Sequence, residues 1–135
     1  KRRKNAELYL KYFSEFELIE IENNFEYSHN NKIIYPKAIY KNSNTKNYHI
    51  YNQYTIRVQN RDELQQFLSN REIGTDIYYP VPLHKQDCFA PLQAENSDFP
   101  ITNQISNDVL SIPIFPELTE EQIRYVAESI RDFYI

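Results

Sequence analysis

The sequence predicts an α/β fold in which a small, mainly antiparallel sheet carries helices packed on one face. Apolar residues recur at helical spacing in some segments, and other segments alternate apolar and polar residues as strands do. The two kinds of segment follow one another along the chain. With 135 residues the chain can bury one core, so we expect a single domain over residues 1–135.

The composition narrows the classes of function. The formal net charge of -4 gives no reason to expect a nucleic-acid partner. No apolar run approaches the roughly 20 residues that cross a bilayer, so no membrane partner is expected. The one cysteine, Cys88, excludes an internal disulfide and favours a reducing, cytoplasmic location. Cys88 has no obvious base beside it, so we expect an inert buried thiol rather than a nucleophile.

Two features of the first residues indicate where the chain begins. The sequence contains no methionine, and a helical pattern begins at its first residues without a cap. We therefore expect the chain to begin inside a longer protein.

The 12 Tyr and 8 Phe are many for a small domain and suggest a face that meets another surface.

The first third of the chain should begin with a helix over residues 1–13, where apolar groups recur at spacings of three and four. Its basic start is either a solvated helix face, which we favour, or a nuclear-type or phosphate-binding patch. Residues 16–21 alternate weakly and predict a short strand. Residues 32–40 are apolar but contain Pro36, which favours an edge strand.

The clearest strand is predicted over residues 48–59, where alternation gives two different faces. One face is mostly apolar and should pack on helices: Ile50, Asn52, Tyr54, Ile56 and Val58. The other face should meet a cleft, a partner or water: His49, Tyr51, Gln53, Thr55 and Arg57. We expect Arg57 to pair with a carboxylate rather than to bind phosphate.

A short helix should follow Asn60, because Asn60 and Glu63 have the spacing of a capping box. Asp62 and Glu63 are expected to interact with the helix dipole rather than to act as general acids. The one glycine, Gly74, is expected to end this unit in a left-handed conformation.

Residues 75–80 predict the next strand, after which Pro80 and Pro82 force an extended path. A short helical turn is expected over residues 85–92. A helix is expected over residues 101–109, with three apolar residues on one stripe: Ile101, Ile105 and Val109.

The chain should end with a short strand over residues 110–115 and a helix over residues 119–133. Thr119 and Gln122 form a capping box for this helix. Its buried stripe is expected to contain Ile123, Val126, Ala127 and Ile130.

The sequence shows no complete catalytic constellation. One glycine is too few for a glycine-rich phosphate loop. His29, His49 and His84 lie in separate segments without paired ligands, so no metal site is predicted. From the residues alone, His84 could simply donate to a backbone carbonyl.

Several segments nevertheless share one pattern, in order: HIYNQYTIR at 49–57, RDEL at 61–64, Gly74-Thr75, YPVPLH at 79–84 and LSIPIFPELT at 110–119. This pattern resembles the C-terminal domain of nucleotide-sugar aminotransferases of the DegT/DnrJ/StrS family. The resemblance is best over residues 48–135. Before Tyr48 it is thin, although residues 1–13 resemble the interdomain helix of the family through Arg3, Asn5 and Tyr9.

The resemblance implies a fold type I enzyme that depends on pyridoxal phosphate. A large domain of such enzymes holds the cofactor on a lysine, and the small domain closes over the active site of a homodimer. The implied reaction moves an amino group from glutamate to a nucleotide-linked keto sugar, as in polysaccharide biosynthesis. The cofactor domain is absent from these residues. The chain alone is therefore expected to bind no cofactor, to contain no catalytic residue and to be inactive.

The resemblance also implies that the small domain helps to bind the nucleotide sugar, whose phosphates and hydroxyls require hydrogen-bond donors. We expect substrate contacts from Gln53, Tyr54, Tyr79, His84, Lys85 and Gln86. Simpler roles remain open, with Tyr54 in the core and Lys85 and Gln86 at the surface. An alternative function is a free-standing protein-interaction or regulatory module derived from such a domain.

Overall fold

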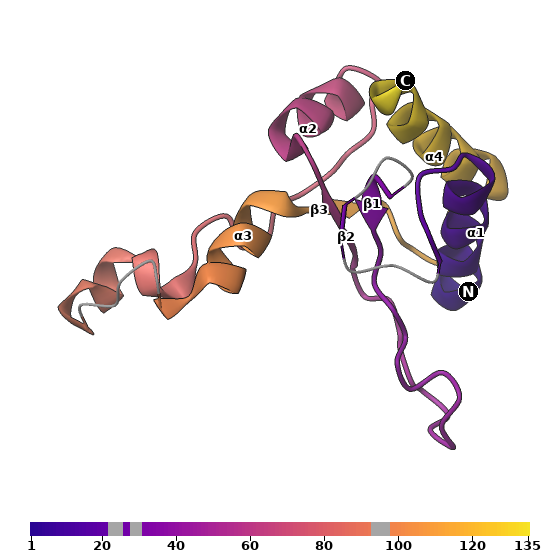
Figure 1. Ribbon diagram of the computed structural model, residues 1–135. Helices are drawn as coiled ribbons and strands as arrows, with labels where there is room; N and C mark the ends of the chain where they lie inside the picture. The colour runs from indigo at the N-terminus through magenta and orange to yellow at the C-terminus, as the bar shows by residue number, and fades with distance from the viewer. Residues whose placement is uncertain (22–25, 28–30, 93–97) are drawn as a thin grey trace.

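A computed structural model of the chain describes residues 1–21, 26–27, 31–92 and 98–135; His29 lies outside these ranges. The helices are α1 (Arg2–Glu15), α2 (Arg61–Ser69), α3 (Pro100–Asp108) and α4 (Glu120–Tyr134), with two 3₁₀ turns, η1 (Leu83–Lys85) and η2 (Asp87–Leu92). The strands are β1 (Ile33–Ile34), β2 (Tyr54–Val58) and β3 (Val109–Ile112). Helices α1 and α4 lie side by side against the sheet, while α3 and the 3₁₀ turns extend away from it (Figure 1).

The three strands form one antiparallel sheet in the order β1-β2-β3. Strand β2 is central and pairs Tyr54 with Ile112 and Arg57 with Val109. Edge strand β1 pairs Ile33 with Val58. The predicted α/β class with an antiparallel sheet is therefore confirmed, and so is the edge position of the segment that contains Pro36.

The core lies between one face of this sheet and helices α1, α2 and α4. Strand β2 contributes Tyr54, Ile56 and Val58, all fully buried, as the alternation predicts. The predicted stripe of α4 is also buried: Ile123, Val126, Ala127 and Ile130. The capping box of α4 is confirmed, because the Gln122 N–H donates to Thr119 Oγ1 at 3.2 Å and the Thr119 N–H donates to Gln122 Oε1 at 3.0 Å.

Three side chains of α1 hold the connection between β3 and α4. Asn5 Nδ2 donates to the Phe115 carbonyl at 2.8 Å, and the Tyr9 hydroxyl donates to the Pro113 carbonyl at 2.8 Å. The Tyr12 hydroxyl donates to Glu120 Oε1 at 2.8 Å. The first two bonds satisfy backbone carbonyls that lie outside any strand ladder, because Pro113 and Pro116 interrupt regular pairing there.

Two predicted strands differ from the structure. Residues 16–21 form no strand; instead, the Leu18 carbonyl accepts the N–H groups of Lys32 and Ile33. The predicted strand over 75–80 is reduced to one bridge, in which Asp76 and Ser111 exchange two backbone hydrogen bonds of 3.0 and 2.8 Å. The prolines that follow Asp76 explain why this pairing stops so early.

The ends of α2 also differ from the prediction. Asn60 has a left-handed backbone (φ 53°) and its side chain makes no capping bond, so the predicted capping box is absent. After α2 the left-handed position is Glu72 (φ 59°), not Gly74, whose φ is not positive. Asparagine tolerates this conformation through its short polar side chain, whereas a glutamate there is held by its surroundings.

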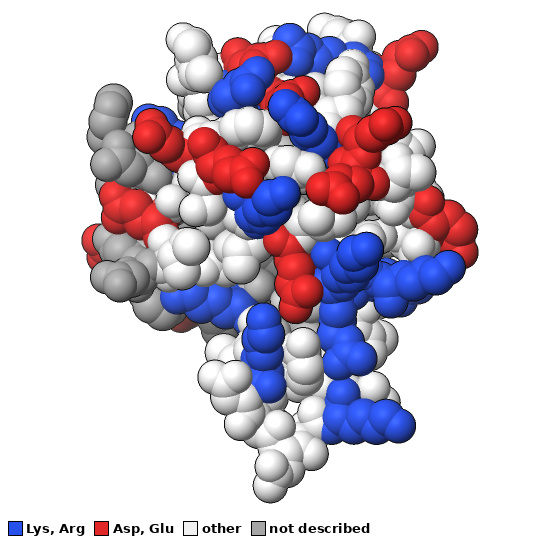
Figure 2. Space-filling view, turned by 90° about the vertical axis from the view of Figure 1, so that its right-hand side faces the viewer, with Lys and Arg blue, Asp and Glu red and all other residues white. Residues whose placement is uncertain are grey.

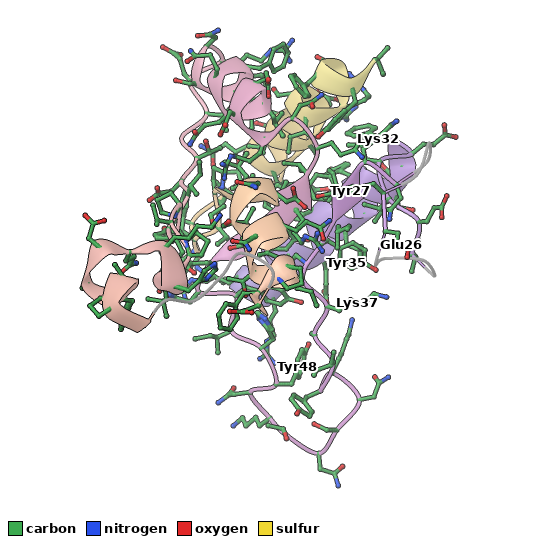
Figure 3. The ribbon with its side chains drawn as sticks, turned by 60° about the vertical axis from the view of Figure 1, so that its left-hand side comes forward. Glu26, Tyr27, Lys32, Tyr35, Lys37 and Tyr48 are labelled. Atoms are coloured by element: carbon green, nitrogen blue, oxygen red, sulfur yellow. The ribbon has the colours of Figure 1, made fainter. Side chains whose placement is uncertain are left out.

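The segment between β1 and β2 projects from the body of the molecule, which is why β2 begins at Tyr54 rather than at Tyr48 (Figure 1, Figure 3). The first turn of α1 supports it: Arg3 Nη1 donates to the Lys46 carbonyl at 3.2 Å, and the Arg3 guanidinium lies 5.0 Å from the centre of the Tyr48 ring. Figure 2 shows lysine and arginine side chains gathered toward this end of the molecule. Within the described ranges, no helix has the length and apolar character to span a bilayer.

We predict that Tyr9→Phe lowers the free energy of unfolding by about 1–2 kcal/mol, because the mutation leaves the Pro113 carbonyl without its donor. Tyr125→Phe is a matched control, since its hydroxyl donates to the Arg71 carbonyl at 3.2 Å on the surface. Its cost should stay below about 0.5 kcal/mol. Urea unfolding followed by circular dichroism measures both, and equal costs would contradict an anchoring role for Tyr9.

A second prediction concerns alkaline pH. Burial raises the pKa of Tyr54 well above its ordinary value, and burial raises that of Tyr9 as well. In the unfolded chain both should ionise near pH 10. Their contribution to stability is therefore complete below about pH 10 and is lost as the pH rises further. Urea midpoints between pH 8 and pH 11 should fall less steeply for Tyr54→Phe than for the wild type, and parallel curves would refute this.

Candidate functional site

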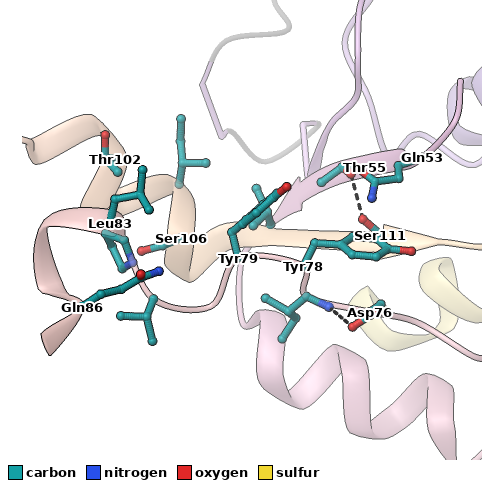
Figure 4. Close-up of a pocket in the computed structure, with 15 residues that line it drawn as sticks. Gln53, Thr55, Asp76, Tyr78, Tyr79, Leu83, Gln86, Thr102, Ser106 and Ser111 are labelled. Carbon is teal, nitrogen blue, oxygen red and sulfur yellow. Dashed lines mark hydrogen bonds between the residues drawn. The ribbon is translucent and has the colours of Figure 1, made fainter. Parts of the chain in front are cut away.

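A pocket of about 430 Å³ lies where the chain leaves the sheet on the side opposite the core. Its apolar floor consists of Ile77, Val81, Pro82, Leu83, Ile105 and Val109. Its polar lining consists of Gln53, Thr55, Asp76, Gln86, Thr102, Ser106 and Ser111. Figure 4 shows Tyr78 and Tyr79 between the end of the pocket near Gln53 and the end near Gln86. The pocket therefore combines water-excluding surface with hydroxyl, amide and carboxylate groups that can form hydrogen bonds.

Two local features of the sequence build this pocket. The Asp76–Ser111 bridge ties the start of the segment to β3, and Pro80 and Pro82 then prevent any further ladder. The chain consequently turns away from the sheet and forms η1, which places Gln86 across from α3 (Figure 4).

The polar lining near the sheet is ordered by hydrogen bonds. The hydroxyls of Thr55 and Ser111 lie 2.8 Å apart, because the antiparallel register sets these residues opposite one another. On α3, the Ser106 hydroxyl donates to the Asn103 carbonyl at 2.9 Å. Hydroxyls and amides can both donate and accept, so this lining suits a ligand rich in hydroxyl groups.

Three of the six predicted substrate residues line the pocket together: Gln53, Tyr79 and Gln86. His84 is not among the residues that line the pocket; it is half-buried, with its ring centre 4.8 Å from that of Phe99. The Nε2 atom of His84 is buried and bonds to none of the described residues. Lys85 is exposed and does not line this pocket. The prediction that Cys88 is buried is wrong, because the 3₁₀ turn that carries it extends away from the core and leaves the thiol exposed.

Tyr54 is not brought to the pocket. Its side chain is 1% exposed, and its ring centre lies 5.1 Å from that of Tyr9 and 5.8 Å from that of Tyr51. This position matches the alternative in which Tyr54 packs in the core. Burial raises the pKa of its hydroxyl, so the side chain stays neutral at physiological pH.

The candidate list drawn from the sequence omits Thr55, Ser111, Thr102 and Ser106, which line the pocket. A signal existed for Thr55, because it belongs to the face of β2 predicted to meet a cleft. Ser111 would have followed from the register of β2 with β3, but a register is set by tertiary pairing. No pattern in the sequence places Thr102 and Ser106 against these strands.

The pocket does not fit pyridoxal phosphate. This cofactor attaches to a lysine, and its phosphate and ring nitrogen require charged or strongly polar partners. The lysines in the described ranges are exposed or half-exposed, and neither a lysine nor an arginine lines the pocket. The same ranges contain no cluster of three His, Cys, Asp or Glu residues that could hold a metal.

Comparison of the sequence with known proteins finds several relatives. A Geobacillus stearothermophilus protein named pleiotropic regulatory protein is 49% identical over 87 residues, which cover 64% of this chain and 23% of the relative. A UDP-N-acetyl-3-dehydro-alpha-D-glucosamine 3-aminotransferase from Acidithiobacillus ferrooxidans is 42% identical over 84 residues, covering 62% of this chain and 22% of the relative. The chain thus spans about a quarter of the curated relatives it matches.

Solved structures of other proteins superpose on this chain. S. venezuelae DesV, in complex with a ketimine intermediate, superposes with a TM-score of 0.71 at 25% identity, over 98% of this chain and 32% of DesV. A DegT DnrJ EryC1 StrS aminotransferase from Brucella abortus has the same fold, with a TM-score of 0.69 at 23% identity over 98% of this chain and 30% of that chain. The sequence model of the DegT/DnrJ/EryC1/StrS aminotransferase family matches residues 1–131. The chain therefore belongs to the DegT/DnrJ/EryC1/StrS aminotransferase family.

Proposed function

We propose that this chain forms the small C-terminal domain of a nucleotide-sugar aminotransferase and that its pocket binds part of the nucleotide sugar. The main observation in support is a pocket with an apolar floor and a lining of hydroxyls, amides and one carboxylate, Asp76, in a chain of this family. Two curated relatives are named as enzymes that aminate or form amino sugars linked to UDP or dTDP.

In this proposal each part of the pocket has a defined task. Gln53, Gln86 and Thr102 exchange hydrogen bonds with sugar hydroxyls, while the apolar floor excludes water from that side of the sugar. The buried Nε2 of His84 gains the hydrogen-bond partner it lacks among the described residues. These groups orient the substrate and carry out no bond-making step.

The chemistry of amino transfer belongs, in this proposal, to parts of the protein outside these residues. Pyridoxal phosphate supplies an electron sink, and a lysine of another domain holds it. Glutamate is the amino donor, and the active enzyme is a homodimer. Residues 1–13 form the interdomain helix and residues 48–135 the small domain proper, so residues 1–135 alone are expected to be inactive.

A second candidate function is a regulatory or protein-interaction module. It is favoured by the name of the G. stearothermophilus relative and by apolar side chains on the segment that leaves the sheet. Tyr79 is 78% exposed, Ile101 70% and Leu83 67%. A module of this kind would bind a protein through these side chains and would not respond to nucleotide sugars.

We predict that His84→Ala and Gln86→Ala each raise the KM for the nucleotide sugar about five-fold in the full-length protein. One hydrogen bond to a neutral group contributes about 1 kcal/mol, which corresponds to that factor. The assay uses glutamate and a panel of dTDP- and UDP-linked keto sugars. Gln104→Ala is the control, because Gln104 is exposed on α3 and does not line the pocket.

An unchanged KM for both variants would remove these residues from the substrate site. Failure of the wild-type protein to aminate any sugar of the panel, together with tight capture of a protein partner, would favour the regulatory module instead. That capture should then be lost in Leu83→Asp, because Leu83 is exposed.

A further inference from the structure

Residues 77–92 and 98–108, here called the arm, hold one side of the pocket and all of α3. Figure 1 shows the arm extending away from the sheet and the core helices. Both ends of the arm join the sheet near β3. One end follows the Asp76–Ser111 bridge, and the other is the junction of α3 with β3. The direction in which α3 points is therefore set at its C-terminal end.

The last residue of α3 makes a charged contact with the central strand. Asp108 Oδ2 lies 2.9 Å from Arg57 Nη2, and the two side chains are only 19% and 23% exposed. A carboxylate at the C-terminal end of a helix is repelled by the helix dipole, so Asp108 is unfavourable there without a cation. The pair with Arg57 offsets this cost and links α3 to β2, as the sequence suggests for Arg57.

A second arginine reaches the same helix end. Arg61 is the first residue of α2, its side chain is 10% exposed, and Nη1 donates to the carbonyls of Ser106 at 3.3 Å and Val109 at 3.1 Å. The final carbonyls of a helix lack partners within that helix, and a guanidinium can serve two of them at once. Two arginines from different elements thus converge on one helix end.

Helix α3 forms a wall of the pocket through Thr102, near its free end, and through Ile105 and Ser106, nearer its fixed end, together with Leu83 and Gln86. A nine-residue helix is about 13 Å long, so a tilt of about 10° at its fixed end would move its other end by about 2 Å. A displacement of about 1 Å in a substrate-positioning group can cost a large factor in rate. The fastening of α3 therefore controls the width of the pocket.

We propose that Arg57 and Arg61 are positioning residues that clamp the C-terminal end of α3 and thereby set the affinity of the pocket for the sugar. The inference rests on the proposed function, because it assigns the clamp an effect on substrate binding. Neither arginine lines the pocket, so both act through α3.

The test compares Arg57→Met, Arg61→Met and Asp108→Asn in the full-length enzyme. Each should raise the KM for the nucleotide sugar about ten-fold and leave the KM for glutamate within two-fold. Arg57→Lys should restore most of the affinity, because an ammonium can still pair with Asp108. Arg61→Lys should not, because one ammonium reaches two diverging carbonyls poorly.

The matched control is Arg71→Met, which breaks the 2.8 Å pair of Arg71 with Asp132 on α4, away from the pocket. It should leave both KM values within two-fold. A partial loss of folding would lower the apparent kcat but would not raise the KM for one substrate alone, so a selective rise in the KM for the nucleotide sugar isolates the clamp. An unchanged KM for the nucleotide sugar in a well-folded Arg61→Met enzyme would overturn the inference.

Amide hydrogen exchange of α3 separates the inference from the proposed function. In Arg61→Met, amides of residues 104–108 should exchange at least ten-fold faster, whereas Arg71→Met should leave them unchanged. If the wild type aminates no nucleotide sugar, the proposed function fails, and with it the effect on affinity. Unchanged exchange in Arg61→Met would overturn the clamp itself, whatever the activity.

Discussion

The antiparallel pairing of β2 with β3 is the contact on which the other parts of the structure depend. In this register the side chains of β2 alternate between two environments. Tyr54, Ile56 and Val58 enter the core with α1, α2 and α4. Thr55 and Arg57 point to the opposite side, where one lines the pocket and the other binds the end of α3. A slip of one residue would exchange these two sets, so core and site are fixed together.

The prolines explain why a pocket forms on that side instead of more sheet. Proline lacks an N–H for a strand ladder, so Pro80 and Pro82 release the chain after the bridge at Asp76. The released segment returns through α3 to β3, and the space between its two halves becomes the pocket. The molecule therefore has a packed side, which holds the fold, and an open side with exposed aromatic and aliphatic groups.

Membership of the aminotransferase family agrees with a molecule that has one packed side and one open side. The pocket supplies hydroxyls, amides, one carboxylate and apolar surface, while its lining includes neither lysine nor arginine. In the function we propose, such a domain selects and orients a sugar, and charged cofactor chemistry takes place elsewhere. Arg57 and Arg61 connect the C-terminal end of α3, on the open side, to β2 and α2.

The sequence by itself determined the class of the fold, the central strand, the C-terminal helix with its cap, and the family. These follow from local periodicity, from capping chemistry and from motifs that lie close together along the chain. It also identified Gln53, Tyr79 and Gln86, which the structure brings to one pocket. Tertiary structure alone decided the rest. Tyr54 packs in the core rather than in the pocket, Thr55 meets Ser111, and Arg61 reaches α3. Each of these depends on strand register or on contacts between distant segments, which local patterns along a chain do not specify.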